Sequence, residues 1–172
     1  MPKVTKKMLG RHSLNCRGRI VDLTRPAVMG ILNLTPDSFY ADSRLLGGTG
    51  ASTLDRAGQM LADGATFLDL GGYSTRPGAT DISPVQEADR VLPAIELILR
   101  AFPDALVSVD TFRASVARQA VAAGACLVND VSGGTLDRDM FATVAELGVP
   151  YVLMHLRGTP QTMQSLAQYN NV

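Results

Sequence analysis

The feature that most restricts the fold is an alternation of short apolar runs with longer stretches of helical spacing, which begins near residue 26. Each run is almost continuously apolar, which is typical of parallel strands that are buried on both faces. The runs cover residues 27–32, 66–70, 105–109, 126–128 and 151–154. This alternation of strand and helix predicts an α/β protein with a parallel sheet.

The stretches between the runs carry the spacing of amphipathic helices. We expect helices over residues 51–62, 85–100, 113–123 and 138–147, and the start of a fifth over 162–168. Pro84 suits a helix start, and Gly64, Gly124 and Gly148 stand where helices end. In the second helix we expect one buried side, made of Val85, Ala88, Val91, Leu92, Ile95 and Leu99.

Successive parallel strands with right-handed crossovers make a sheet curl one way. Five such units are part of a (β/α)8 TIM barrel, which takes about 250 residues, or form an open doubly wound sheet; the pattern alone does not separate these. Residues 9–24 predict a hairpin of two short strands, 14–16 and 19–21, that caps the bottom of the sheet. We interpret residues 1–172 as a single barrel domain that is incomplete at its C-terminus.

Composition restricts the partners. Formal net charge is zero and the sequence pI is about 6.7, which argues against nucleic acid or an anionic membrane as a partner. No apolar run approaches the ~18 residues of a membrane span, and no apolar stretch follows the N-terminal lysines as a signal peptide requires. Cys16 and Cys126 lie far apart, and Cys126 stands in an apolar run as a buried free thiol would. These features predict a cytoplasmic location.

Polar residues stand where each predicted strand ends. The carboxyl ends of parallel strands meet on one side of the sheet, where ligands bind in α/β folds. The residues in question are Asn33, the loop Thr75-Arg76-Pro77, Asp110, Asn129 and His155.

The chemistry of these groups suits a flat heterocycle with an anionic arm. Ionised Asp110 accepts hydrogen bonds, while Asn129 both donates and accepts, so together they match ring N–H donors and ring acceptors. The planar fork of Arg76 and the hydroxyl of Thr75 match phosphate oxygens. Asn33 offers a neutral oxygen for Mg²⁺ that is shared with a phosphate.

Each of these residues also has a structural interpretation. Asp110 precedes a helix and could be its N-cap, and Asn129 could satisfy loop backbone. Arg76 could lie on a surface loop, Asp37 could cap a turn, Asp130 and His155 could be structural, and Met154 could be core.

Longer motifs make the functional interpretation specific. Residues 29–39 (MGILNLTPDSF) and 71–79 (GGYSTRPGA) are similar to the first two signatures of the dihydropteroate synthase family. Further segments of the chain resemble later strand ends and a loop of that family: residues 108–111 (SVDT), 128–131 (VNDV), 153–155 (LMH) and 158–164 (GTPQTMQ). The resemblance runs from about residue 26 to 164, and departs at Tyr73, where many members carry Glu.

The resemblance implies a transferase of folate biosynthesis and a sulfonamide target. The family condenses p-aminobenzoate with (7,8-dihydropterin-6-yl)methyl diphosphate on a (β/α)8 barrel and releases pyrophosphate. Asn33 would bind Mg²⁺, and Arg76 and Asp110 would be the catalytic residues. Substrate would be bound by Phe39, Thr75, Arg76, Pro77, Asp110, Asn129, Val131 and Met154.

The family's later strands supply another Asp, a Lys and an Arg–His pair, so we expect activity, and a possible homodimer, from a full-length form and not from 172 residues alone. One alternative is the pterin-binding domain of a folate/corrinoid methyltransferase, which needs no pyrophosphate clamp. Another is an inactive half-barrel. Thr75, Arg76 and Pro77 favour the synthase, because only an enzyme that releases pyrophosphate needs that clamp.

Overall fold

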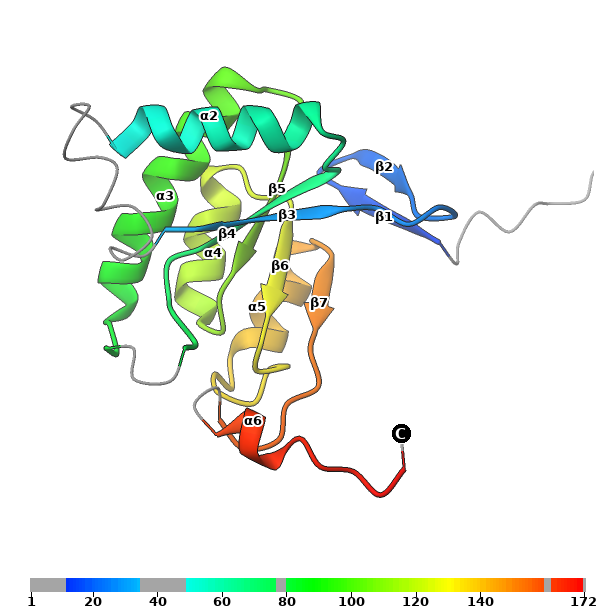
Figure 1. Ribbon diagram of the computed structural model, residues 1–172, viewed down its shortest axis with the longest axis vertical. Helices are drawn as coiled ribbons and strands as arrows, with labels where there is room; N and C mark the ends of the chain where they lie inside the picture. Colours follow the sequence, from blue (N-terminus) through cyan, green and yellow to red (C-terminus); the bar gives the residue numbers. More distant parts are fainter. Residues whose placement is uncertain (1–11, 35–48, 77–79, 160–161, 172) are drawn as a thin grey trace, which may run out of the picture.

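The computed structural model describes residues 12–34, 49–76, 80–159 and 162–171. Its main sheet has five parallel strands in the order β3-β4-β5-β6-β7 (Figure 1). The strands are β3 (Met29–Asn33), β4 (Phe67–Gly71), β5 (Leu106–Asp110), β6 (Leu127–Asp130) and β7 (Tyr151–Leu153). A doubly wound sheet reverses its strand order at a switch point. These strands follow chain order without reversal, so the expected barrel class is confirmed for the part described.

Helices alternate with the strands as expected. They are α2 (Thr49–Ala62), α3 (Pro84–Ala101), α4 (Ala114–Ala123), α5 (Met140–Leu147) and the short α6 (Met163–Leu166). Three of them end near a glycine with positive φ: 100° at Gly64, 122° at Gly124 and 63° at Gly148. Glycine adopts this region without steric cost, which confirms the predicted helix ends.

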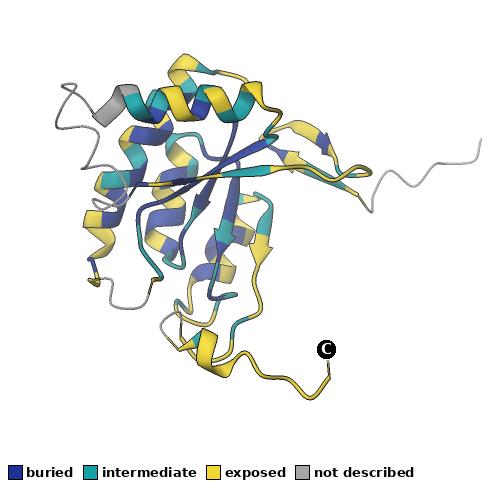
Figure 2. Cartoon of the chain, viewed as in Figure 1, coloured by how far each residue is buried: buried dark blue, intermediate teal, exposed yellow. Residues whose placement is uncertain are grey.

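The main core lies between the sheet and its helices. Alternate strand residues point to this outer face, including Leu68, Leu70, Val107 and Val109, and they pack against apolar residues of α3 and α4. Figure 2 shows the buried strands packed against the helix layer and the more exposed edge at β7. Since side chains alternate, the other strand residues face away from the helices; we call this side the inner face.

Helix α3 departs from its expected buried side. Ser83 forms a capping box with Gln86, and Pro84 occupies the first turn. Val85 is 68% exposed, so its assignment to the buried side was wrong. It lies in the first turn on the flank of the helix, whereas the residues that face the sheet are Glu87, Ala88, Val91, Ala94, Ile95 and Ile98.

The N-terminal hairpin is confirmed as the antiparallel pair β1 (Ser13–Cys16) and β2 (Arg19–Asp22). Arg17 and Gly18 both have positive φ, 56° and 86°, as a two-residue type I′ turn requires. A second core cluster joins the hairpin to the first residues of the main strands: Cys16, Val21, Phe67, Leu106, Cys126 and Leu127. The hairpin therefore closes the amino end of the sheet. No helix among the described residues is long and apolar enough to cross a membrane.

Candidate functional site

Three predicted strand-end residues fall on one rung of the sheet together with Gly71. Asn33 pairs with Gly71, Gly71 with Asp110, and Asp110 with Asn129 across β3 to β6. Residues on one rung of parallel strands point to the same face, and strands lie about 4.8 Å apart, so Asn33 and Asn129 stand roughly 14 Å apart. We call these four residues the site rung. It confirms that three predicted side chains gather on the inner face at the carboxyl end of the sheet.

The second residue below each rung position faces the same side. Asp69 pairs with Ser108, directly beneath Gly71 and Asp110. Both side chains are buried, with 3% and 0% exposure. Asp69 Oδ1 and Ser108 Oγ have no hydrogen-bond partner of good geometry among the described residues. The inner face is therefore apolar at the hairpin and polar beneath the site rung.

Asp110 stands in an unusual electrostatic setting. Burial, and after it the nearby carboxylates of Asp69, Glu87 and Asp130, together raise its pKa to about 7. Gly71 leaves room beside it, because a Cβ at position 71 would lie 3.4 Å from Asp110 Oδ2. A carboxyl group of this kind carries a proton or a charge near neutral pH, depending on its ligand.

The structural alternatives for Asp110 and Asn129 do not hold. The backbone N–H of Ala114, at the start of α4, donates instead to Asp137 Oδ2 at 2.8 Å. The amide nitrogen of Asn129 donates to Asp69 Oδ2 at 2.9 Å and not to loop backbone. Both predicted ligand-binding groups are thus free of the scaffold roles considered for them.

Asp130 has the structural role that the sequence suggested. Its carboxylate is fully buried and accepts from the backbone of Ser132 and Gly134 and from the Tyr151 hydroxyl, at 2.7 to 2.9 Å. Its backbone oxygen accepts from the N–H of Met154 at 3.2 Å. These bonds fix the loop after β6, where Val131 is half-buried, against the end of β7. The Met154 side chain is 37% exposed, so it is not core.

The loop after β4 begins in a fixed position. Gly72 is buried, and a Cβ there would lie 3.0 Å from the backbone oxygen of Glu87. Arg90 donates to the Gly72 carbonyl at 2.8 Å. Thr75 is half-buried and Arg76 is exposed. The predicted residues Phe39 and Pro77, and Asp37, lie outside the described residues.

His155 has a side-chain partner, since its Nε2 lies 3.0 Å from the Tyr169 hydroxyl. Both residues are exposed, so this contact agrees with a structural interpretation and adds no catalytic base. Asn33 is exposed at the end of β3. The described residues hold no cluster of three or more His, Cys, Asp or Glu side chains that could bind a metal.

Sequence reasoning missed several buried polar residues. Asp69 was assigned only to an apolar run, and Ser108 only to an apolar run and a family motif, although a carboxylate inside such a run needs a partner. Glu87 has no exposed surface and pairs with Arg113, whose side chain is 13% exposed. The signal available was a charged residue at a core position of the α3 pattern.

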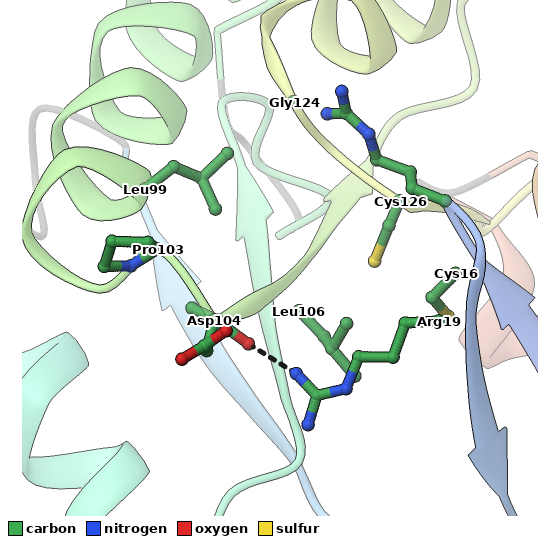
Figure 3. Close-up of a pocket in the computed structure, with 10 residues that line it drawn as sticks. Cys16, Arg19, Leu99, Pro103, Asp104, Leu106, Gly124 and Cys126 are labelled. Carbon is green, nitrogen blue, oxygen red and sulfur yellow. Dashed lines mark hydrogen bonds between the residues drawn. The ribbon is translucent and has the colours of Figure 1, made fainter.

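A hollow of about 350 Å³ lies at the opposite, hairpin end of the sheet (Figure 3). Arg19 donates there to the carbonyl of Asp104 at 2.9 Å, and Cys16, Cys126 and Leu106 line the wall. None of the predicted site residues within the described ranges borders this hollow.

Comparisons with known proteins agree with this geometry. A family described as pterin binding enzyme matches residues 29–172. Dihydropteroate synthase of Escherichia coli is 42% identical over 162 residues, which is 92% of this chain and 55% of that protein. Folic acid synthesis protein fol1 of Pneumocystis carinii is 49% identical over 144 residues, 83% of this chain and 19% of that protein.

Similarity extends to solved structures. Dihydropteroate synthase of Xanthomonas albilineans with 4-aminobenzoic acid is 45% identical with a TM-score of 0.77. The alignment covers 87% of this chain and 53% of that one. The chain therefore spans about half the length of the single-function relatives it matches, and a smaller share of fol1.

Proposed function

Because the chain belongs to the family of pterin-binding enzymes, we propose that it supplies the pterin-binding strands of a dihydropteroate synthase. That reaction joins p-aminobenzoate to (7,8-dihydropterin-6-yl)methyl diphosphate and releases pyrophosphate. The observation that carries the proposal is the site rung, which gathers Asn33, Asp110 and Asn129 on one face of the sheet.

The pterin ring would lie against the inner face, held by Asp110 and Asn129. Its ring N–H groups need acceptors and its ring oxygen and nitrogens need donors, which a carboxylate and an amide supply together. Val131 and Met154 would contact the apolar faces of the ring. Asp110 is half-buried, so a ring N–H can reach its carboxyl group. Such a donor favours the ionised form of the carboxyl group.

The diphosphate arm would extend toward Thr75 and Arg76. Arg76 is exposed and close in sequence to the fixed Gly72, so its guanidinium is available to an anion. Arginine binds phosphate oxygens through paired N–H donors, which Thr75 can supplement. Pro77 and Phe39 belong to this proposal as neighbours of the aminobenzoate.

Asn33 fits Mg²⁺ only as one neutral oxygen beside a diphosphate, because no acidic cluster surrounds it in the described part of the chain. This suits Mg²⁺, which often takes one or two protein ligands together with phosphate oxygens and water. The bound ion would neutralise charge on the departing pyrophosphate.

The chemical step breaks the bond between the pterin methylene carbon and the diphosphate oxygen. The oxygen keeps the electron pair, and the methylene carbon becomes electron-poor in conjugation with the ring. Arg76 stabilises the departing anion, and ionised Asp110 stabilises positive charge that develops on the ring. The amine of p-aminobenzoate then bonds to the methylene carbon and loses a proton. Positioning and electrostatics carry most of the catalysis.

Isothermal titration of the 172-residue chain with 6-hydroxymethylpterin tests the binding half of the proposal. We expect saturable binding that Asp110→Ala and Asn129→Ala each weaken by about tenfold, since each removes a hydrogen bond to the ring. Asp104→Ala, at the hairpin end, is the matched control and leaves the affinity unchanged. Absence of binding by the folded wild-type chain contradicts the proposal.

Turnover is tested in a chimera in which the chain is joined to the C-terminal part of the Escherichia coli relative. We expect dihydropteroate from p-aminobenzoate and the pterin diphosphate. Arg76→Ala should lower kcat/KM by at least about a hundredfold, as expected for a lost oxyanion partner. Undiminished turnover in that variant contradicts the role of Arg76 as the pyrophosphate clamp. A chimera that binds pterin but forms no dihydropteroate favours the methyltransferase alternative.

A further inference from the structure

The polar layer beneath the site rung has no place in the proposed chemistry, yet it contacts a residue that does. Asp69 reaches from β4 diagonally across β5 to Asn129 on β6, where its Oδ2 lies 2.9 Å from the amide nitrogen. Asp69 is 3% exposed and Ser108 beside it is fully buried. Burying a carboxylate in this way costs free energy unless hydrogen bonds offset it, and in the described part of the chain the side chain of Asp69 is hydrogen-bonded to Asn129.

We propose that Asp69 is a positioning residue: it holds the amide nitrogen of Asn129, so that the amide oxygen faces the open side of the sheet as an acceptor for a ring N–H. This deepens the proposed function and rests on it. An asparagine side chain has one donor end and one acceptor end. Fixing one end therefore decides what the other presents to a ligand.

The direction of this hydrogen bond follows from charge. An ionised carboxylate can only accept, so the NH₂ end of Asn129 must turn toward Asp69. Burial raises the pKa of Asp69, while the nearby Ser108 hydroxyl and the hydrogen bond from Asn129 act against that rise. Asn129 Oδ1 accepts no hydrogen bond from the described residues, so it remains available to a ligand.

The same carboxylate also acts on Asp110. It is one of three carboxylates, with Glu87 on α3 and Asp130 on β6, that raise the pKa of Asp110 after the larger effect of burial. Asp69 thus helps to decide both the polarity of one ring-binding group and the protonation of its neighbour. These two effects separate experimentally, because an amide at position 69 keeps an acceptor for Asn129 but removes the charge.

A double-mutant cycle with 6-hydroxymethylpterin tests the proposal on the 172-residue chain. Asp69→Ala should weaken binding about tenfold, since it frees the Asn129 amide to turn, while Asp69→Asn should stay within about threefold of wild type. In an Asn129→Ala background, Asp69→Ala should have almost no further effect. An equal loss in both backgrounds means that Asp69 only supports the fold, and overturns the proposal.

A matched control separates orientation from charge. Glu87→Gln removes another buried carboxylate near Asp110 but leaves the hydrogen bond between Asn129 and Asp69 in place. It should leave the cycle between positions 69 and 129 intact, as judged by the same titrations. If Glu87→Gln abolishes the coupling between positions 69 and 129, the coupling arises from charge alone, and the proposed role of Asp69 is contradicted.

Nuclear magnetic resonance of the ligand-free chain keeps the two proposals distinguishable. The side-chain NH₂ of Asn129 should exchange slowly with water in wild type and in Asp69→Asn. It should exchange rapidly in Asp69→Ala. Fast exchange in the folded wild type overturns the positioning role even if pterin binds. Slow exchange without pterin binding overturns the proposed function and with it the ligand-directed role.

Discussion

At the scale of single residues, Gly71 shows how the site rung makes room for chemistry. Every other member of the rung carries a polar side chain, whereas Gly71 brings only backbone beside Asp110. The carboxylate of Asp110 therefore stands beside an open position and above the buried Asp69. Burial first, and the neighbouring acids after it, make the carboxyl group of Asp110 change its charge near neutral pH.

Asp110 should make stability depend on pH. Its pKa is about 7 in the folded chain and near 4 when unfolded, so between these values the folded state keeps a proton that the unfolded state has lost. Its contribution to stability therefore falls as pH rises from 4 to 7. The free energy of unfolding of Asp110→Asn should therefore rise relative to that of wild type across this window, and the difference should reach on the order of 2–4 kcal/mol at pH 8. Urea unfolding at several pH values measures the difference, and a gap that does not change with pH contradicts the assignment.

The buried pair of Glu87 and Arg113 should be the most sensitive ionic contact. Arg113→Ala leaves Glu87 buried without its cation, which should cost about 3–5 kcal/mol of unfolding free energy. Arg118→Ala is the matched control, because it breaks a comparable contact to Glu146 on the surface and should change little. Chemical denaturation of both variants makes the comparison; similar losses argue against a buried role for Glu87.

At the scale of elements, the glycines that end helices differ in their surroundings. Gly64 and Gly124 have similar positive φ, 100° and 122°, but a Cβ at Gly64 meets nothing within 4 Å, whereas one at Gly124 would lie 2.3 Å from Leu99 Cδ1. By backbone conformation alone, replacing either glycine should cost the same free energy. The packing around Gly124 should make its replacement cost more.

Gly64→Ala should cost about 1 kcal/mol or slightly more, the penalty of a left-handed backbone for a residue with a Cβ. Gly124→Ala should cost more, because Leu99 on α3 must also move. Thermal or urea unfolding of the two variants gives the comparison. Equal costs indicate that Leu99 moves freely and that α3 is loosely packed there.

The elements were predictable where periodicity is strong, and the site was predictable in part. Apolar runs placed all five main strands, and the turn residues Arg17 and Gly18 separated the hairpin strands. Strand ends then brought Asn33, Asp110 and Asn129 together, because parallel strands share one polarity. The prediction that Val85 is buried was wrong, since spacing does not reveal which flank of a helix a sheet covers. Asp69 was missed because one carboxylate hardly changes an apolar average, and its partner lies 60 residues away.

At the scale of the whole molecule, the hairpin and the sheet share the second core cluster, so they should open together. Cys16 and Cys126 are both buried there, and burial raises the pKa of both thiols, that of Cys126 to about 12. A thiol with so high a pKa is also a poor nucleophile.

Both thiols should therefore resist alkylation in the folded chain and react only on unfolding. Iodoacetamide labelling across a urea gradient, read by mass spectrometry, should give one transition for both that coincides with the loss of circular dichroism. Labelling of Cys16 at lower urea than Cys126 shows instead that the hairpin detaches first.

The hairpin also decides how molecules reach and leave the inner face. Packed apolar side chains close the amino end, and the polar strand ends lie at the other, so a ligand of the site rung should arrive and leave on the carboxyl side of the sheet. Where two molecules bind at that side, the one nearer the hairpin must bind first and leave last.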